Sequence, residues 1–200
     1  MRRLVLASAS PRRRELLTQA GYAFEVCPAH VNEDLRPDEE AIAYVVRLAR
    51  EKALCVLAEM SSKDPAPPQV IVLGADTTVT LDGHILAKPE DAADAARMLR
   101  MLSGRTHRVI TGVAIATEKG VEVAAEVTGV QFRTLSDEEI AAYIATGEPM
   151  DKAGAYGIQG LAAKWIPRVE GCYFNVVGLP LALVVTMLEQ AGISKLKAES

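Results

Sequence analysis

Apolar residues recur along the chain with two different periods, and these periods predict both strands and helices. Residues 70–73 form a continuous apolar run, which is typical of a fully buried strand. Within residues 42–60 the apolar positions fall on one stripe at helical spacing, and Lys52 lies at the edge of that stripe. The predicted strands are residues 4–7, 24–27, 70–73, 77–81, 84–86, 107–116, 121–132 and 172–177. The predicted helices are residues 11–20, 42–60, 91–102, 137–145 and 180–190.

Turn and capping residues separate these elements. Asp82-Gly83 predicts a hairpin, a second turn is expected at 118–120, and Ser136 begins a capping box. The prolines of 61–69 indicate a surface loop, and 194–200 form a polar tail that we expect to fray. Because hairpins interrupt the alternation of strands and helices, we predict an α/β fold with a mixed, twisted sheet flanked by helices. The 200 residues suffice for one good-sized domain or two small lobes, and no linker is long enough to separate independent domains, so we treat 1–200 as a single domain. We expect the ligand site in a cleft between the elements that cover the sheet.

Composition narrows the classes of function. The formal net charge is −4 and aromatic residues are few, which argues against a nucleic-acid-binding protein. No apolar run approaches the ~20 residues of a membrane span, and the apolar stretch at the N-terminus is too short for a signal peptide. We therefore expect a cytoplasmic protein that does not bind membranes. The three cysteines have no metal-ligand or disulfide spacing and are interpreted as buried or half-buried small hydrophobes.

The most informative polar segment begins at Ser8. Ser10 is a natural N-cap and Pro11 a natural first helical residue, so the arginines at 12–14 fall in the first helical turn. Cations are unfavourable there, because a helix N-terminus carries about half a positive charge. Free backbone N–H groups, two serine hydroxyls and three guanidiniums therefore predict an anion site suited to phosphate. The alternative is a solvated helix start whose arginines extend into water.

Acidic and basic residues elsewhere could complete such a site. Asp76 follows the buried strand and is interpreted as a metal-binding or general-base carboxylate at the mouth of a site; the alternative is a turn-forming aspartate. A glycine, Gly74, precedes it and lets another group approach closely. Glu33, in an acidic loop, is either a second metal carboxylate or a solvated acid. Lys52 and Lys88 are typical surface lysines when taken alone, but with the arginines they suggest a clamp for a polyphosphate.

Residues 147–160 are rich in glycine and charge, which predicts a ligand-binding loop rather than a core element. The carboxamide of Gln159 can pair with the imide edge of uracil or thymine, whereas cytosine presents a reversed pattern. A flexible surface loop is the alternative. The three histidines have no metal-ligand spacing, and the chain lacks the signatures of P-loop enzymes and of acyl-transfer nucleophiles.

Several motifs follow one another along the chain. They are SASPRRRELL from Ser8, GADT at 74–77, KP at 88–89, SGRTHRV from Ser103, GEPMDKAGAYGIQG at 147–160 and GLP at 178–180. On these motifs residues 4–188 resemble the Maf family of nucleoside triphosphate pyrophosphatases. The resemblance implies an α/β fold similar to that of inosine triphosphate pyrophosphatases, with a cleft between two lobes. It also implies hydrolysis of nucleoside triphosphates to the monophosphate and pyrophosphate with a divalent metal cation, Mg²⁺ or Mn²⁺.

The resemblance assigns roles to single residues. Asp76 matches the family's proton acceptor, and Glu33 matches an acidic position that would hold the metal together with Asp76. Family members often have a Gly-Ile-Asp-like sequence before this position, where the chain has 30-HVN-32. The residues that match positions of substrate choice are Arg12, Thr77 and Gln159. Those that match the phosphate site are Arg13, Lys52 and Lys88, to which the local pattern adds Ser8 and Ser10. The complete GAYGIQG motif resembles the subfamily acting on dTTP and UTP rather than on 7-methyl-GTP.

Two other functions are compatible with the same pattern. One is a nucleotide-binding regulator of division or septum formation, with hydrolysis incidental, because Maf proteins have been associated with septation arrest. The other is a house-cleaning enzyme for modified pyrimidine nucleotides, which would use the same chemistry. The sequence leaves the oligomeric state open, a homodimer included.

Overall fold

The computed structural model describes residues 2–63 and 69–193, which form two compact units. Unit 1 consists of Met1–Asp76, Thr111–Glu126 and Gly178–Ser200, and unit 2 of Thr77–Ile110 and Val127–Val177. Three of the four boundaries, at 76–77, 110–111 and 126–127, therefore lie within long strands rather than in linkers. The predicted tail at 194–200 and most of the predicted loop at 61–69 lie outside the described residues.

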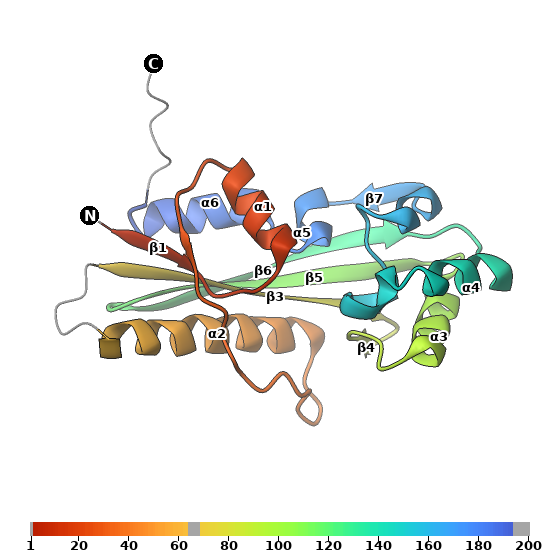
Figure 1. Ribbon diagram of the computed structural model, residues 1–200, viewed down its shortest axis with the longest axis horizontal. Coiled ribbons are helices and arrows are strands. Elements are labelled where there is room, and N and C mark those ends of the chain that lie inside the picture. The colour runs from red at the N-terminus through yellow and green to blue at the C-terminus, as the bar shows by residue number, and fades with distance from the viewer. Residues whose placement is uncertain (1, 64–68, 194–200) are drawn as a thin grey trace, which may run out of the picture. The chain divides into compact units, whose positions relative to one another are not determined.

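One mixed sheet contains all seven strands of the described chain, in the order β2-β1-β3-β5-β6-β7, with β4 paired to β3 (Figure 1). Strand β1 (Arg3–Leu6) pairs in parallel with β2 (Glu25–Val26) and with β3 (Val70–Leu81). Strand β4 (His84–Leu86) is antiparallel to β3, and β7 (Arg168–Glu170) is antiparallel to β6 (Gly120–Gln131). Strand β5 is Thr106–Thr117. The predicted α/β fold with a mixed sheet is confirmed.

Helices flank the sheet in unit 1. Helix α2 (Ala41–Lys63) covers one face, and α1 (Pro11–Gln19) and α6 (Leu181–Gln190) lie on the other (Figure 1). The α2 side of the core is built from alternate strand residues and from the helical stripe; its buried members are Val5, Ala7, Ala49, Ala53, Val56, Val70, Val72, Ala114 and Ala116. The remaining helices are α3 (Ala92–Leu102), α4 (Asp137–Ala145) and α5 (Tyr173–Val177).

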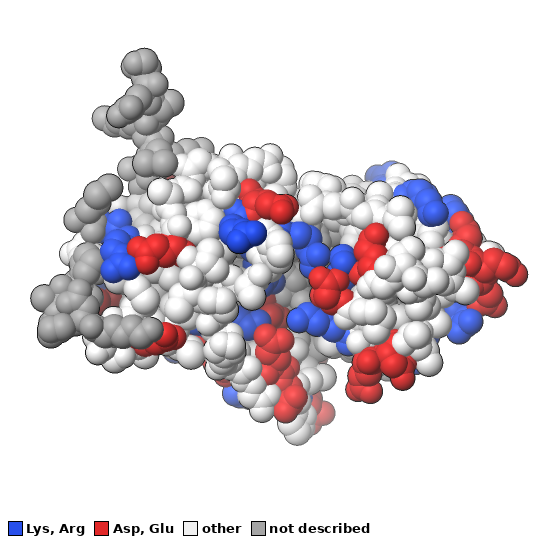
Figure 2. Space-filling view, in the orientation of Figure 1, with Lys and Arg blue, Asp and Glu red and all other residues white. Residues whose placement is uncertain are grey.

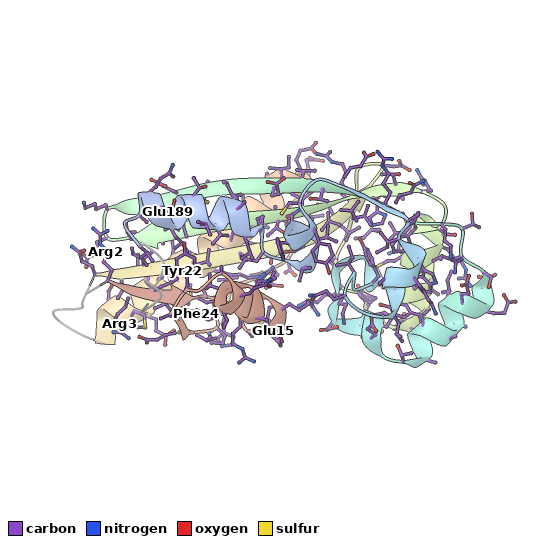
Figure 3. All side chains as sticks on the ribbon, turned by 90° about the horizontal axis from the view of Figure 1, so that it is seen from above. Arg2, Arg3, Glu15, Tyr22, Phe24 and Glu189 are labelled. Carbon is purple, nitrogen blue, oxygen red and sulfur yellow. The ribbon has the colours of Figure 1, made fainter. Side chains whose placement is uncertain are left out.

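Residues that follow α1 help to cover the second face of the sheet in unit 1. Gly21 ends that helix with φ 81°, as its C′ position predicts, and Tyr22 follows it with 6% of its surface exposed. Burial, with a contribution from the charge of Glu189 on α6, raises the pKa of the Tyr22 hydroxyl (Figure 3). Tyr22 therefore lies within electrostatic range of Glu189 on α6.

Strand β3 is continuous through the segment in which two strands were predicted. Residues 70–73 and 77–81 belong to one strand, so the prediction of a break at 74–76 was wrong, and Asp76 lies in mid-strand rather than at a strand end. The sequence favours a strand end there because aspartate is depleted in strands. Pairing with neighbouring strands outweighs this weak preference.

The segment 172–177 was predicted as a strand and is a short helix instead, with α5 at Tyr173–Val177. Asn175, fully buried, donates its amide to the carbonyl oxygen of Val109 at 3.0 Å and to the hydroxyl of Thr128 at 2.9 Å. These bonds connect the helical turn to the sheet of unit 2. A mostly apolar segment of six residues does not distinguish a strand from one helical turn, and the contacts of Asn175 favour the helical turn.

Two smaller predictions also need correction. Cys55 is exposed on α2, although all three cysteines were expected to be buried or half-buried; Cys27 and Cys172 are half-buried as expected. The 147–160 segment was predicted to lie outside the core, but Tyr156 is only 6% exposed and Ala155 is fully buried. Two short 3₁₀ helices, Glu148–Asp151 and Ala153–Ala155, fold this segment, and a third follows at Leu161–Trp165.

The core of unit 2 is aromatic and contains a buried histidine. The rings of His107, Phe132, Tyr156 and Trp165 pack edge to face, and the Tyr156 hydroxyl lies 2.7 Å from Nε2 of His107. Burial lowers the pKa of His107 from 6.5 to about 4. The imidazole is therefore neutral at pH 7.

This histidine predicts a pH dependence of stability. Because the folded pKa lies below the ordinary value, the unfolded chain binds the proton more tightly between pH 6.5 and about 4. The contribution of neutral His107 is complete above pH 6.5 and is lost as the pH falls towards about 4. Urea unfolding should show a free energy that falls by at most about 1.4 kcal/mol per pH unit in this window. The slope should be smaller in a folded His107→Gln variant; an equal slope in both proteins would assign it to other groups.

Charged side chains of both signs are interspersed on the face shown in Figure 2. Many form exposed ion pairs, such as Arg3 with Glu25 at 2.6 Å, with side chains 38% and 54% exposed. Pairs of this kind contribute about 0–1 kcal/mol, since water screens them. The buried charges of unit 1 are a different case and lead to the candidate site.

Candidate active site

The start of α1 is built as the sequence predicts. Ser10 is the N-cap, with φ −63° and ψ 118°, and its hydroxyl accepts the backbone N–H of Arg13 at 3.4 Å. The hydroxyl oxygen of Ser8 accepts the N–H of Ser10 at 3.2 Å and an Nη1 hydrogen of Arg13 at 3.2 Å. Nε of Arg13 donates to the carbonyl oxygen of Gly178 at 2.8 Å. Arg13 is therefore held across the helix start.

The three arginines differ in environment. Arg12 and Arg13 are half-buried, whereas Arg14 is exposed. The solvated helix start is therefore wrong as a description of Arg13 and fits Arg14.

A buried lysine lies between two carboxylates in the same unit. Nζ of Lys52 is 2.6 Å from Oδ1 of Asp76 and 2.6 Å from Oε1 of Glu33. Lys52 and Asp76 are each 8% exposed, and the side chain of Glu33 is 49% exposed. Lys52 is thus not a surface lysine, and Asp76 contacts a cation rather than forming a turn. An ammonium in this position needs such partners, because an unpaired buried charge is costly.

Two glycines allow this arrangement. A Cβ added to Gly74 would overlap the carbonyl oxygen of Ala49, and one added to Gly112 would overlap the carbonyl oxygen of Val45, both on α2. Gly74 therefore admits a helix backbone rather than a ligand. It lies two residues before Asp76, so both face the same side of β3. The close approach of α2 to this face brings Lys52 to Asp76.

The acidic loop that contains Glu33 is bound to α2 by two residues that the sequence did not single out. The hydroxyl of Tyr44 donates to the carbonyl oxygen of Glu33 at 2.9 Å. Arg47 donates to the carbonyl oxygen of Asp34 at 3.1 Å and pairs with Glu39 at 2.6 Å. Burial, followed by the charges of Asp76 and Glu33, raises the pKa of Tyr44 to about 12, so its hydroxyl stays a donor at neutral pH. In the sequence the available signal was the hydroxyl of Tyr44 on the apolar side of the predicted helix. A tyrosine in that position is interpreted first as a core residue.

The helix start and the carboxylates are electrostatically coupled. Burial lowers the pKa of the Arg13 guanidinium, the charges of Asp76 and Glu33 act in the opposite direction, and Arg12 adds to the lowering. Arg13 is therefore within electrostatic range of both acids. The predicted site residues that belong to unit 1 are Ser8, Ser10, Arg12, Arg13, Glu33, Lys52 and Asp76.

The other predicted residues belong to unit 2. Thr77 follows Asp76 in β3 and is half-buried. Lys88 follows β4 and is exposed, and Gln159 is exposed in the segment between the second and third 3₁₀ helices.

The donor set in unit 1 fits a hard divalent cation. Within residues 2–63 and 69–193, no three or more His, Cys, Asp or Glu side chains are grouped to form a metal site. Mg²⁺, however, is usually bound through one or two carboxylates together with substrate phosphates and water. Asp76 and Glu33 are two such carboxylates, and both contact the ammonium group of Lys52.

Comparison with known proteins identifies the family. The model of the family described as Maf-like protein matches residues 3–191. The chain belongs to the Maf family. A Maf relative from Koribacter versatilis, named dTTP/UTP pyrophosphatase, is 54% identical over 95% of this chain and 95% of its own. A protein of the same name from Escherichia coli O157:H7 is 52% identical over 94% of this chain and 92% of its own.

Among solved structures, a nucleoside-triphosphatase/dITP/XTP pyrophosphatase from Mycobacterium abscessus matches 96% of this Maf chain and 98% of its own. The TM-score is 0.41 and the sequence identity 15%. The family assignment does not depend on this match.

Proposed function

We propose that this protein hydrolyses nucleoside triphosphates at the α–β phosphoanhydride, with dTTP and UTP as its substrates, and releases the monophosphate and pyrophosphate. The observation that supports this best is Lys52 between Asp76 and Glu33, in one unit with the Ser8–Arg13 helix start. The names of the relatives supply the substrates. A function limited to anion binding would need the cationic side chains but not two carboxylates beside them.

The helix start supplies the anion-binding half of the site. The helix dipole favours negative charge at this end of α1. Arg13 is held by Ser8 and Gly178, so a phosphate meets an oriented guanidinium rather than a free one. We assign Ser8, Ser10, Arg12, Arg13, Lys52 and Lys88 to the triphosphate and the leaving pyrophosphate.

The carboxylates supply the other half. Asp76 and Glu33 would hold Mg²⁺ or Mn²⁺. Such an ion, when bound, neutralises charge on phosphate oxygens. Oδ1 of Asp76 accepts from Lys52, and we assign its second oxygen to the attacking water. Asp76 takes a proton from that water while the water oxygen bonds to the α-phosphorus. The bond between the α-phosphorus and the α–β bridging oxygen breaks, and pyrophosphate leaves.

Base recognition is assigned to Gln159 and Thr77 of unit 2 and to Arg12 of unit 1. The carboxamide of Gln159 offers a donor and an acceptor to the imide edge of thymine or uracil, and Thr77 with Arg12 takes part in substrate choice.

A nucleotide panel tests the function. With Mg²⁺ or Mn²⁺, dTTP and UTP should be turned over many times per protein molecule, with equal amounts of monophosphate and pyrophosphate, and chelation with EDTA should stop the reaction. Release of orthophosphate would contradict cleavage at the α–β position. Binding without repeated turnover would favour the regulator instead, and a higher kcat/KM for modified pyrimidine nucleotides would favour the house-cleaning enzyme.

Three further properties stay predictions from the sequence: a cytoplasmic location, the absence of nucleic acid partners and the open choice between monomer and homodimer. In the described parts of the chain, no helix combines the length and apolarity needed to cross a membrane.

A further inference from the structure

One tyrosine–glutamate pair binds both ends of the turn that contains Gln159. The hydroxyl of Tyr143 donates to Oε1 of Glu148 at 2.8 Å and accepts the backbone N–H of Gly157 at 3.2 Å. Oε2 of Glu148 accepts the backbone N–H of Leu161 at 3.1 Å. The two bonded N–H groups lie two residues before and two residues after Gln159. All these residues belong to unit 2.

The turn is packed onto this pair as well as bonded to it. A Cβ on Gly160 would overlap the carboxylate of Glu148, and one on Gly157 would lie 2.8 Å from Cε of Lys152. Nζ of Lys152 in turn donates to the carbonyl oxygen of Glu148 at 2.6 Å. The N–H of Gly160 donates to the carbonyl oxygen of Gly157 at 3.0 Å, which closes the turn. The backbone around Gln159 is therefore held although its side chain is exposed.

Tyr143 also joins the turn to the core of unit 2. It is 3% exposed, and its ring packs edge to face on Trp165 with the centroids 4.9 Å apart. Burial and the bond to Glu148 raise the pKa of its hydroxyl, so the hydroxyl remains a donor. The ring has a packing role, and the hydroxyl adds a separate polar link between core and turn.

We propose that Tyr143 and Glu148 are positioning residues for base selection: they hold the 157–161 turn so that the Gln159 carboxamide is presented in one orientation. The inference rests on the proposed function, in which Gln159 recognises the pyrimidine. A bidentate contact discriminates between bases only if both hydrogen bonds form together, and a mobile backbone would lose that condition. Ordering the turn before substrate binds also avoids an entropy cost on binding.

Two conservative variants separate this role from packing. Tyr143→Phe keeps the ring on Trp165 and removes the hydroxyl that joins Gly157 to Glu148. Glu148→Gln keeps the shape but has a single acceptor oxygen, so its amide N–H₂ group would face the hydroxyl of Tyr143 or the N–H of Leu161. Matched controls are Tyr173→Phe, a residue that is 44% exposed, and Glu118→Gln in an exposed turn.

The measurement is kcat/KM for dTTP divided by kcat/KM for dCTP in each variant. We expect this ratio to fall about fivefold or more in Tyr143→Phe and in Glu148→Gln, mostly through a higher KM for dTTP. The double variant should lose little more than either single variant, because the two side chains act through one network. Amide hydrogen exchange at Gly157 and Leu161 should be faster in both variants, and the controls should match the parent protein.

The outcomes distinguish this inference from the proposed function. If Gln159→Glu lowers the ratio and neither network variant does, the positioning role is wrong while base recognition by Gln159 stands. If no variant changes the ratio although pyrophosphate is released, base recognition by Gln159 is itself wrong. An equal loss with all nucleotides, together with a lower unfolding free energy, would assign Tyr143 and Glu148 a structural role only.

Discussion

Replacement of Asp76 by asparagine is expected to lower kcat for pyrophosphate release from dTTP by about 10²–10⁴-fold, the usual contribution of a general base. Asparagine keeps an oxygen that can accept from Lys52 at the position of Oδ1, so the local geometry is retained. It cannot take a proton from water, and it is a weaker ligand for a divalent cation. Steady-state kinetics at saturating Mg²⁺ separates the loss of the base from a loss of metal affinity.

The control for this variant is Asp82→Asn. Asp82 lies in the β3–β4 hairpin with φ 51°, a conformation that asparagine adopts readily, and its side chain is 61% exposed. Its turnover should match that of the parent protein. Circular dichroism and urea unfolding should show both variants folded, and near-normal kcat in folded Asp76→Asn would exclude Asp76 as the proton acceptor.

Replacement of Gln159 by glutamate is expected to lower kcat/KM for dTTP and UTP by roughly 5–150-fold, which corresponds to about 1–3 kcal/mol of discrimination. A carboxylate has acceptors only, so it meets the imide carbonyls with repulsion in place of a hydrogen bond. Cytosine has an amino group that donates a hydrogen bond to a carboxylate, so kcat/KM for dCTP should fall less. The comparison across bases is the informative measurement.

The matched substitution is Gln190→Glu, at the exposed C-terminal end of α6, which adds the same charge elsewhere. It should leave the ratio between bases unchanged. A uniform loss across dTTP, UTP, dCTP and ATP in Gln159→Glu would mean that the added charge repels the triphosphate and that the carboxamide does not recognise the base.

Local signals in the sequence predicted local structure well. Ser10, Pro11 and the arginines behind them specified the α1 start, because capping depends on residues within one turn. Likewise, the capping box at Ser136 and the Asp82-Gly83 turn form as expected. The failures lie where long-range contacts decide: the continuity of β3 through Gly74, the helix α5 held by Asn175 and the burial of Tyr156.

The site shows the same division. The GADT motif indicated Asp76, and the family resemblance indicated Lys52 and Glu33. No spacing in the sequence, however, predicts that one ammonium lies 2.6 Å from each of the two carboxylates. The sequence 30-HVN-32 departs from the usual family pattern before Glu33, and nevertheless the Glu33 carboxylate contacts Lys52. The sequence did not indicate Tyr44 and Arg47, because each binds a backbone carbonyl oxygen of the acidic loop. No pattern of side chains predicts such a contact.

The two glycines under α2 have a consequence for how this chain can vary through mutation. Gly112 is far in sequence from every proposed catalytic residue, yet a methyl group there would meet the backbone of α2 at Val45. A substitution that adds a side chain at Gly112 would push the helix away from the sheet and move Lys52 from Asp76. Selection for catalytic activity would therefore act on Gly112, which contributes no functional group. A survey of inactive mutants would find substitutions at this position together with those of the catalytic residues.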